Sequence, residues 1–205
     1  MENCLVKRAE FIENISSYPQ HKIYYIDECG IDTYLYREYA HAPRGQKVMG
    51  IVSGKKFKRT NIVAARRGGN SSNGGNSGNS NGNSSNGGNS GNGSNGSNGG
   101  GNIVAPIIYD GTTDSIFFEH WFDHELLPAI PKGSCCVMDN ATFHRKNELY
   151  GLAAKAGCTV IFLPPYSPDL NPIEKYWSWL KRQLRKVLPD YDNFMDALVG
   201  CFEVK

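Results

Sequence analysis

Three acidic residues in this chain stand where a carboxylate could meet a ligand: Asp27, Asp139 and Glu174. Asp27 ends the apolar run 23–26, and Asp139 ends a second apolar run that includes Met138. Glu174 begins a helical pattern, with 34 residues between it and the second acid. An unpaired charge beside an apolar strand is costly. We therefore expect the three carboxylates to converge and to hold divalent metal ions.

The chemistry that suits such a set is phosphodiester cleavage and transfer. The reaction must neutralise charge on the transition state and activate a hydroxyl nucleophile, and two divalent ions about 3.5–4 Å apart do both. Mg²⁺ and Mn²⁺ prefer hard oxygen ligands such as carboxylates, water and phosphate. Taken alone, each acid could equally be a helix cap or a solvated side chain, and Glu174 would also suit the helix dipole.

Composition limits the class of protein. The chain has 205 residues, 40% of them hydrophobic, and a formal net charge of +2, so no global field requires an acidic partner. The six cysteines form no C-x-x-C pair, which argues against zinc and favours reduced, buried thiols. No apolar run approaches the length of a membrane span, and the N-terminus is too charged for a signal peptide. We expect a soluble intracellular protein without a membrane partner, cytoplasmic and nucleoid-associated in a bacterium or nuclear in a eukaryote.

The order of the predicted elements indicates an α/β fold. Three antiparallel strands come first and an α-β-α-β-α succession follows, which forms a mixed sheet flanked by helices. We expect the strand before Asp139 to pair beside the strand before Asp27. The predicted strands are residues 21–27, 34–40, 60–65, 103–109, 135–138 and 159–163, and 48–52 either extends the second strand or begins another. The predicted helices are 5–15, the segment between Asp114 and Pro128, 145–156, 172–187 and 190–199.

One segment stands apart, because residues 68–102 are all Gly, Ser or Asn. Such a segment has no apolar side chain to bury and is expected to be disordered. Lengthening a hairpin loop from about 4 to about 36 residues costs only about 2 kcal/mol of closure entropy. We therefore interpret it as an enlarged hairpin tip between strands 60–65 and 103–109. The expected organisation is an N-terminal helix in 1–20, a catalytic domain in 21–189 interrupted by 68–102, and a C-terminal helix in 190–205.

Polar residues near the acids are candidates for supporting roles. Asn140 and His144 flank the second acid, where either could bond a metal-bound water or a phosphate, or serve only a local turn and helix start. Asn171 and Tyr166 lie in the Pro-rich loop before Glu174. Because proline fixes φ, this loop is stiff, and we favour a role in holding the third acid over contact with a substrate.

Two basic clusters could follow a DNA backbone. A solvated face is the competing interpretation, and Trp177 and Trp179 are interpreted as core residues rather than base-stacking ones. The first cluster comprises Lys55, Lys56, Lys58 and Arg59, with Arg66 and Arg67 further on. The second comprises Lys175, Lys181, Arg182, Arg185 and Lys186, on the helix of Glu174.

The runs 138–144 (Met-Asp-Asn-Ala-Thr-Phe-His) and 163–174 (Leu-Pro-Pro-Tyr-Ser-Pro-Asp-Leu-Asn-Pro-Ile-Glu) resemble those of DDE transposases. The similar group is the Tc/mariner superfamily in its bacterial insertion-sequence branch. Residues 26–30 resemble its first-acid motif, although Ser commonly stands there in place of Cys29. The 34-residue spacing matches as well. The resemblance extends from about residue 5 to residue 187, apart from the Gly/Ser/Asn tract.

This resemblance implies an RNase H-like fold, a DDE endonuclease and cut-and-paste DNA transposition. It assigns Mg²⁺ or Mn²⁺, two ions in all, to Asp27, Asp139 and Glu174. The implied partner is double-stranded DNA, as transposon ends and target. The family's N-terminal helix-turn-helix region has no counterpart in the sequence, so a separate helix-turn-helix polypeptide and a homodimer are further candidate partners. The alternatives are an inactive remnant or split-gene fragment that only binds DNA, and a stand-alone RNase H-like nuclease.

Overall fold

The computed structural model describes residues 2–32, 43–47, 59–69 and 102–203. The predicted strand 34–40 and the segment 48–52 lie outside the described residues, as do Lys55, Lys56 and Lys58. Residues 70–101, which make up most of the Gly/Ser/Asn tract, also lie outside them.

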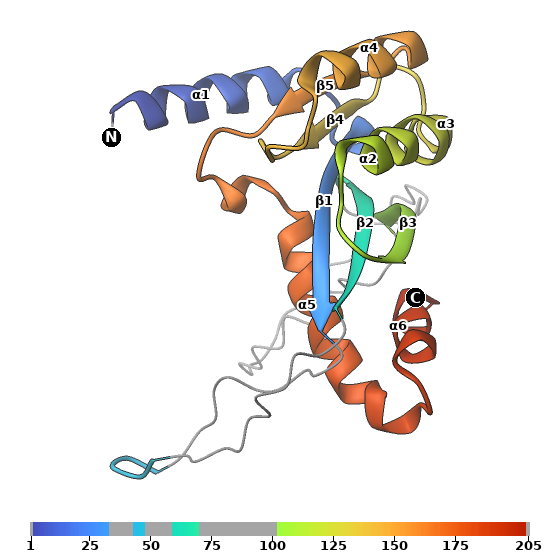
Figure 1. Cartoon of the computed structure of the whole chain (residues 1–205). Coiled ribbons are helices and arrows are strands. Elements are labelled where there is room, and N and C mark those ends of the chain that lie inside the picture. Colours follow the sequence, from blue (N-terminus) through green and yellow to red (C-terminus); the bar gives the residue numbers. More distant parts are fainter. Residues whose placement is uncertain (1, 33–42, 48–58, 70–101, 204–205) are drawn as a thin grey trace, which may run out of the picture.

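A five-stranded mixed sheet organises the molecule (Figure 1). Its strands are β1 (Ile23–Asp32), β2 (Arg59–Arg67), β3 (Ile103–Asp110), β4 (Cys135–Met138) and β5 (Thr159–Phe162). The order across the sheet is β3-β2-β1-β4-β5. β3, β2 and β1 pair antiparallel, whereas β1, β4 and β5 pair parallel. The predicted mixed sheet is confirmed, including the hairpin of β2 with β3 and the pairing of β4 beside β1.

Helices cover both faces of the sheet (Figure 1). They are α1 (Glu2–Ser16), α2 (Ser115–Trp121), the π-helical turn η3 (Phe122–Leu126), α3 (Leu127–Ala129), α4 (Lys146–Ala156), α5 (Ile173–Val187) and α6 (Phe194–Glu203). Short 3₁₀ turns are η1 (Gln20–Lys22), η4 (Pro168–Leu170) and η5 (Leu188–Asp190). Residues of α1, α5 and α6 pack on one face, and residues of α2, η3, α3 and α4 pack on the other.

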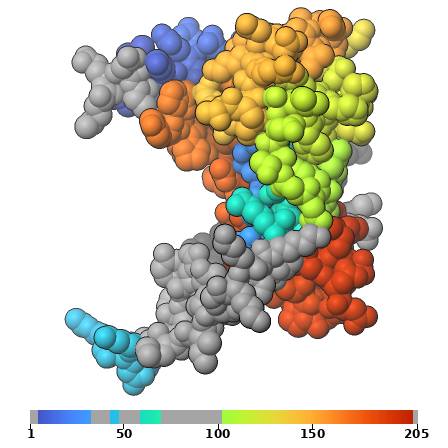
Figure 2. All heavy atoms as spheres, in the orientation of Figure 1, coloured from blue at the N-terminus to red at the C-terminus, as the bar shows by residue number. Residues whose placement is uncertain are grey.

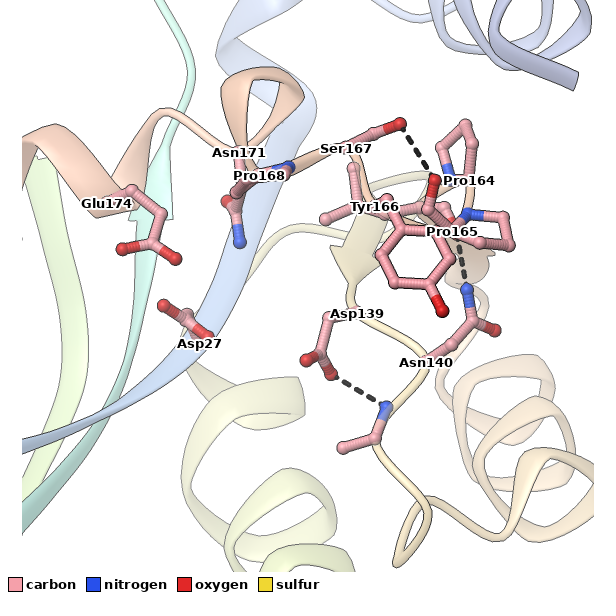
Figure 3. A pocket seen from close by; sticks show the side chains of 12 residues that line it. Asp27, Asp139, Asn140, Pro164, Pro165, Tyr166, Ser167, Pro168, Asn171 and Glu174 are labelled. Atoms are coloured by element: carbon pink, nitrogen blue, oxygen red, sulfur yellow. Dashed lines mark hydrogen bonds between the residues drawn. The ribbon is translucent and has the colours of Figure 1, made fainter. Parts of the chain in front are cut away.

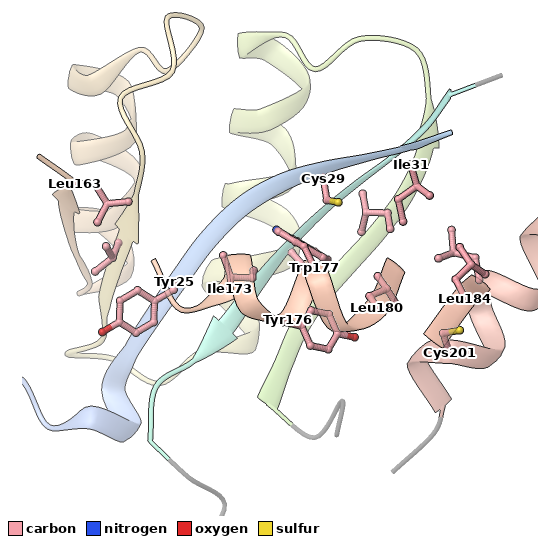
Figure 4. Packing of buried hydrophobic residues seen from close by; sticks show 14 of the residues in the cluster. Tyr25, Cys29, Ile31, Leu163, Ile173, Tyr176, Trp177, Leu180, Leu184 and Cys201 are labelled. Atoms are coloured by element: carbon pink, nitrogen blue, oxygen red, sulfur yellow. The ribbon is translucent and has the colours of Figure 1, made fainter. Parts of the chain in front are cut away.

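The alternation of side chains along β1 creates these two cores. Tyr25 and Cys29 face the first core, where Ile173 and Leu180 of α5 pack against them (Figure 4). The neighbouring Tyr24 faces the second core, on the opposite side of the strand. A strand with apolar residues on both faces is typical of the middle of a sheet, which is where β1 lies.

Helix boundaries follow local chemistry. Asp114 caps α2, because its side chain accepts a hydrogen bond from the Phe117 backbone N–H at 2.8 Å. Gly157, with φ of 72°, ends α4 in the left-handed conformation that glycine adopts without strain. Pro172 stands immediately before α5. The predicted helix 190–199 differs, since the chain first makes η5 and then α6, which begins at Phe194.

The apolar face expected for the N-terminal helix is only partly buried. Phe11 is 6% exposed, but Leu5 and Ile12 are 69% and 52% exposed. Ile116, an apolar residue of α2, is 72% exposed, whereas Phe118 of the same helix is buried. Helical periodicity identifies a face, but the angle at which a helix meets the sheet decides how much of that face is covered.

The structure describes the side chains of five of the six cysteines, and all five are buried free thiols. In the described part of the chain, no helix is long and apolar enough to span a membrane. The buried free thiols agree with those expected from composition.

We predict that replacing residues 70–101 with a short turn preserves the fold. β2 and β3 already pair through Arg66 and Ile103 at the mouth of this segment. Shortening the loop lowers its closure entropy by about 2 kcal/mol, and 1 kcal/mol corresponds to about 2–4 °C in a chain of this size. The Tm measured by calorimetry should therefore stay the same or rise by a few degrees. A large fall in Tm would mean that the segment packs against the domain.

Candidate active site

Strand register makes Asp27 and Asp139 neighbours. The last parallel pair between β1 and β4 joins Tyr25 to Val137, and each acid follows two residues later in its own strand direction. Paired residues of parallel strands point to the same face of the sheet, so both carboxylates lie on the face covered by α5. Both line one cleft with Glu174, and Asp27 lies between the other two (Figure 3).

The position of Asp27 differs from the expected strand end. The predicted strand stopped at this residue, but β1 continues to Asp32 because β2 pairs with it along its whole length. β4 ends earlier, at Met138. The sheet therefore opens beside the middle of β1, and this opening forms the cleft of about 380 Å³ around the acids.

Asp139 is fixed by two contacts on its own loop. Its Oδ1 accepts a hydrogen bond from the Ala141 backbone N–H at 3.0 Å and lies 3.2 Å from His144 Nε2. The hydrogen bond from His144 is the main cause that holds the pKa of Asp139 below its usual range, with the Ala141 bond adding to it. Asp139 is therefore an anion whose carboxylate is oriented by these two contacts.

His144 faces Asp139 from inside the protein. Its side chain is 1% exposed and packs among the rings of Phe118, Phe143 and Phe162. Its Nδ1 has no hydrogen-bond partner among the described residues, whereas its Nε2 donates to Asp139. The sequence suggests a bond from His144 to a metal-bound water or a phosphate, but the ring is buried and contacts the Asp139 carboxylate itself.

Asn140 does line the cleft, but its amide is used within the protein. It donates to the Leu163 carbonyl, and Lys146 Nζ donates to its Oδ1 at 2.5 Å. These bonds tie the loop after β4 to the end of β5 and to the start of α4. The side chain therefore shapes the floor of the cleft.

Trp177 orients Asp27, a role that the sequence did not reveal. Its indole Nε1 donates to Asp27 Oδ2 at 3.0 Å while its ring is buried in the core beneath (Figure 4). The interpretation of Trp177 as a core residue is correct but incomplete. Three residues after Glu174 on α5, it shares a helix face with that acid, and this spacing was the available signal.

Asp27 is destabilised as an anion. Burial first, and then the negative charges of Glu174 and Asp139, raise the pKa of Asp27 to about 7, although the Trp177 bond opposes them. The next residue, Glu28, points to the opposite face, and burial with the two aspartates raises its pKa to about 8. In the described part of the chain, the Oε1 atom of Glu28 has no hydrogen-bond partner. Such a concentration of negative charge indicates a place for cations.

The start of α5 is anchored to the sheet. Asn171, 4% exposed, donates through Nδ2 to the Ile26 carbonyl at 3.4 Å, directly before Asp27 in the chain. Arg66 of β2 donates to the Pro172 carbonyl at 2.6 Å. Both bonds fix the backbone immediately before Glu174, as expected for Asn171. Arg66 belongs to the first basic cluster of the sequence, and in the structure it makes this anchoring contact.

The Pro-rich loop before α5 is also held from α1. Arg8 donates to Ser167 Oγ at 2.9 Å and pairs with both carboxylate oxygens of Asp169. Figure 2 shows α1 and this loop packed together at one end of the molecule. Arg8 lies more than 150 residues away in sequence, so only the fold could reveal the contact.

The other basic residues are distributed unevenly. Arg59 lies over Gly30, where an added Cβ would come within 2.0 Å of its guanidinium. Lys181 is partly buried beside Cys29. Arg182 and Arg185 are exposed on α5.

No three His, Cys, Asp or Glu side chains are gathered closely enough, in the parts of the chain that the structure describes, to enclose a single metal ion. The donor set nevertheless fits hard divalent cations, because oxygen carboxylates face one cleft and repel one another. Asp27 feels the charge of both other acids. The three carboxylates are therefore the residues of this cleft that could hold divalent ions.

Comparison with known proteins identifies the domain. Residues 96–195, which include Asp139, Glu174 and the Pro-rich loop, match the family model of the DDE superfamily endonucleases. Over these residues the chain is similar to the DDE superfamily endonucleases. This agrees with the DDE transposase catalytic domain predicted from the motifs, whereas the insertion-sequence branch stays a prediction.

Solved structures show the same fold. The Mos1 strand transfer complex has a TM-score of 0.56 at 14% identity, covering 99% of this chain and 60% of that one. The Mos1 mariner paired end complex with Mn has a TM-score of 0.54 at 13% identity, with the same coverage. The predicted RNase H-like architecture of the DDE enzymes is confirmed by these likenesses. The chain spans about three fifths of the length of those chains.

Among curated proteins, an uncharacterized protein of Sinorhizobium fredii is 31% identical over 61 residues. The match covers 29% of this chain and 43% of the relative. It adds a sequence relative without adding a function.

We predict that Asp27→Asn stabilises the metal-free protein in a pH-dependent way. The pKa of Asp27 is raised in the folded state, so the unfolded chain loses its proton first and stability falls as pH rises from about 3.8 to about 7. The amide does not titrate, so the gain in Tm of the variant over the wild type should grow across this window and then level off. We expect a difference of at least about 2–4 °C at pH 8, equivalent to about 1 kcal/mol.

The measurement is thermal unfolding in EDTA at pH 4, 5, 6, 7 and 8. Asp32→Asn, at the exposed end of the same strand, is the matched control and should show no such trend. A constant or shrinking difference for Asp27→Asn would show that its carboxylate is not destabilised by its surroundings.

Proposed function

We propose that this domain cleaves DNA phosphodiester bonds and transfers DNA strands in cut-and-paste transposition, with divalent metal ions as cofactors. The observation that carries the proposal is the convergence of Asp27, Asp139 and Glu174 on one cleft. Neighbouring strands supply two of these acids and the first turn of α5 supplies the third. This convergence, together with the family match, favours an active core over an inactive remnant.

Asp27 with Asp139, and Asp27 with Glu174, are the pairs that would hold two Mg²⁺ or Mn²⁺ ions. Such ions, when bound, lower the pKa of a hydroxyl nucleophile and neutralise charge on the phosphate. His144 and Trp177 each fix one carboxylate, and Arg66 and Asn171 fix the backbone of the third. The chain's own contribution is therefore to hold the three carboxylates in position before the ions bind. Ordering them at the moment of binding would otherwise cost free energy.

The exposed face of α5 offers a path for the DNA backbone. Glu174, Ser178, Arg182 and Arg185 follow one another at helical spacing and are all exposed. The two arginines lie about 12–16 Å along the axis from the catalytic acid. Arginine is suited to phosphate through its paired N–H donors. This path supports DNA as the partner and double-stranded ends and targets as substrates.

We predict metal-dependent nicking of supercoiled DNA that requires Asp139. With Mg²⁺ or Mn²⁺, the wild type should produce nicked circles, whereas Asp139→Ala should fall to the background seen in EDTA. Trp177→Phe removes only the indole donor to Asp27, and loss of such an outer contact typically costs about 10–100-fold in metal affinity. It should therefore require about 10–100-fold more metal for the same rate.

Asp32→Asn is again the control and should nick as the wild type does. Equal nicking by Asp139→Ala and the wild type would remove Asp139 from the mechanism. DNA binding without nicking by the wild type would favour the inactive alternative.

We predict that this chain by itself binds DNA through phosphates and with little sequence preference. Arginine and lysine contacts to phosphates read no bases, so log K should fall with log salt by about 0.9 for each phosphate neutralised. Terminal-repeat and scrambled duplexes should compete within about 1 kcal/mol, below the ~1–3 kcal/mol of one good base contact. Arg182→Gln with Arg185→Gln should reduce the salt slope by about 2.

The measurement is a competition titration at two salt concentrations. A tenfold preference for the terminal repeat would instead show that this chain contains a base-reading element of its own.

A further inference from the structure

Tyr166 presents its ring to solvent at the mouth of the catalytic cleft. The side chain is 98% exposed, more than any other large hydrophobic residue in the described parts of the chain. It nevertheless lines the cleft together with Asp139 and Asn140, and Figure 3 shows the ring on their side, across from Glu174. An aromatic ring held in water beside an active site gains nothing from burial within this chain.

The backbone of Tyr166 is strained. Its φ is 56°, in the left-handed region that non-glycine residues rarely adopt. Such a conformation costs of order 1 kcal/mol and persists only where the surroundings enforce it. Glycine would remove this cost, so a tyrosine at this position lowers the stability of the loop.

The surroundings of Tyr166 are correspondingly rigid. Pro164 is buried and Pro165 precedes the tyrosine, while Ser167 is 3% exposed and donates to the Pro165 carbonyl at 3.3 Å. Arg8 holds the same serine from α1. The loop is therefore fixed on both sides of Tyr166, and it aims the ring outward.

The cleft has a volume of about 380 Å³, near the lower end of the range for small-ligand sites, about 300–1,000 Å³, so it has room for a nucleotide. A nucleotide fits such a space when its strand leaves the duplex locally. Unstacking a nucleotide costs a few kcal/mol, and enzymes recover this cost by stacking the base on an aromatic side chain.

The surface continues beyond Tyr166. A second groove of about 250 Å³ lies between α1 and β5, and it shares Asn140 and residues 163–165 with the catalytic cleft. Tyr166 follows directly after this shared wall. A strand that enters the cleft therefore has a path past the ring.

We propose that Tyr166 stacks on the unpaired base next to the reacting phosphate and so holds the locally opened strand in the cleft. This inference rests on the proposed function, since it assumes that the cleft takes DNA. It explains together the exposure, the strained backbone and the rigid loop.

The test compares three substitutions at this one position. Tyr166→Phe keeps the ring, Tyr166→Leu keeps apolar bulk without a ring, and Tyr166→Gly removes both and relieves the backbone. The probes are oligonucleotide duplexes that carry one unpaired 2-aminopurine, whose fluorescence is quenched on stacking. Binding is measured with Ca²⁺, nicking with Mn²⁺, and Tm in parallel.

Loss of one base–aromatic stack weakens binding by about 1–3 kcal/mol, which is about 5- to 160-fold. The Leu and Gly variants should lose this much affinity for the unpaired probe, lose the quenching, and nick more slowly. The Phe variant should match the wild type. The Tm of the Gly variant should stay the same or rise by about 2–4 °C, so that binding and stability change in opposite directions.

Equal quenching and affinity for the Leu variant and the wild type, in a protein that nicks DNA, would overturn the role of Tyr166 and leave the proposed function intact. Equal losses in the Phe and Leu variants would also overturn stacking, because the hydroxyl would then make the contact. Ring-dependent quenching in a wild type that never nicks would support the stacking and count against the proposed function. A wild type that binds no DNA would overturn both.

Discussion

The geometry of the active site follows from the parallel ladder between β1 and β4. Hydrogen bonds in this ladder fix which residues stand side by side, so two acids that are more than one hundred residues apart in sequence become neighbours. A slip of one residue would turn one of them to the opposite face of the sheet. The ladder ends where β4 ends, whereas β1 runs on to Asp32, paired with β2 along its other edge. The same feature therefore sets the spacing of the aspartates and opens the cleft between them.

The site is costly to the folded protein. Burial and mutual repulsion raise the pKa of Asp27 to about 7, and Glu28 beside it has an oxygen that finds no hydrogen-bond partner among the described residues. Asn171 Oδ1 is also buried without one. Unsatisfied buried polar groups cost about 1–3 kcal/mol each, and their clustering here is typical of a functional site that stability alone would not select. The rest of the domain offsets this cost with two apolar cores, one on each face of the sheet.

Helix α5 connects these cores with the chemistry. Its inner face packs on β1, its first turn carries Glu174, and one residue of the inner face, Trp177, also bonds Asp27. The helix cannot shift without moving all three. Arg66 and Asn171 hold its N-terminal end, and Arg8 holds the loop before it. An acid placed on so well anchored an element can keep its position when a charged ligand arrives.

The sequence by itself determined the three acids, the order of the elements and the mixed sheet. Those features are local, because apolar runs, prolines and glycines act on the residues next to them, and the two long motifs lie in continuous segments. The tertiary structure alone decided that β1 continues past Asp27, that His144 turns inward to Asp139, and that α1 leaves Leu5 exposed. It also gave Arg66 and Trp177 their partners, at separations of 106 and 150 residues. Such contacts depend on the packing angle and register of elements distant in sequence, whereas local spacing, as for Trp177 after Glu174, indicates only the helix face on which a partner could lie.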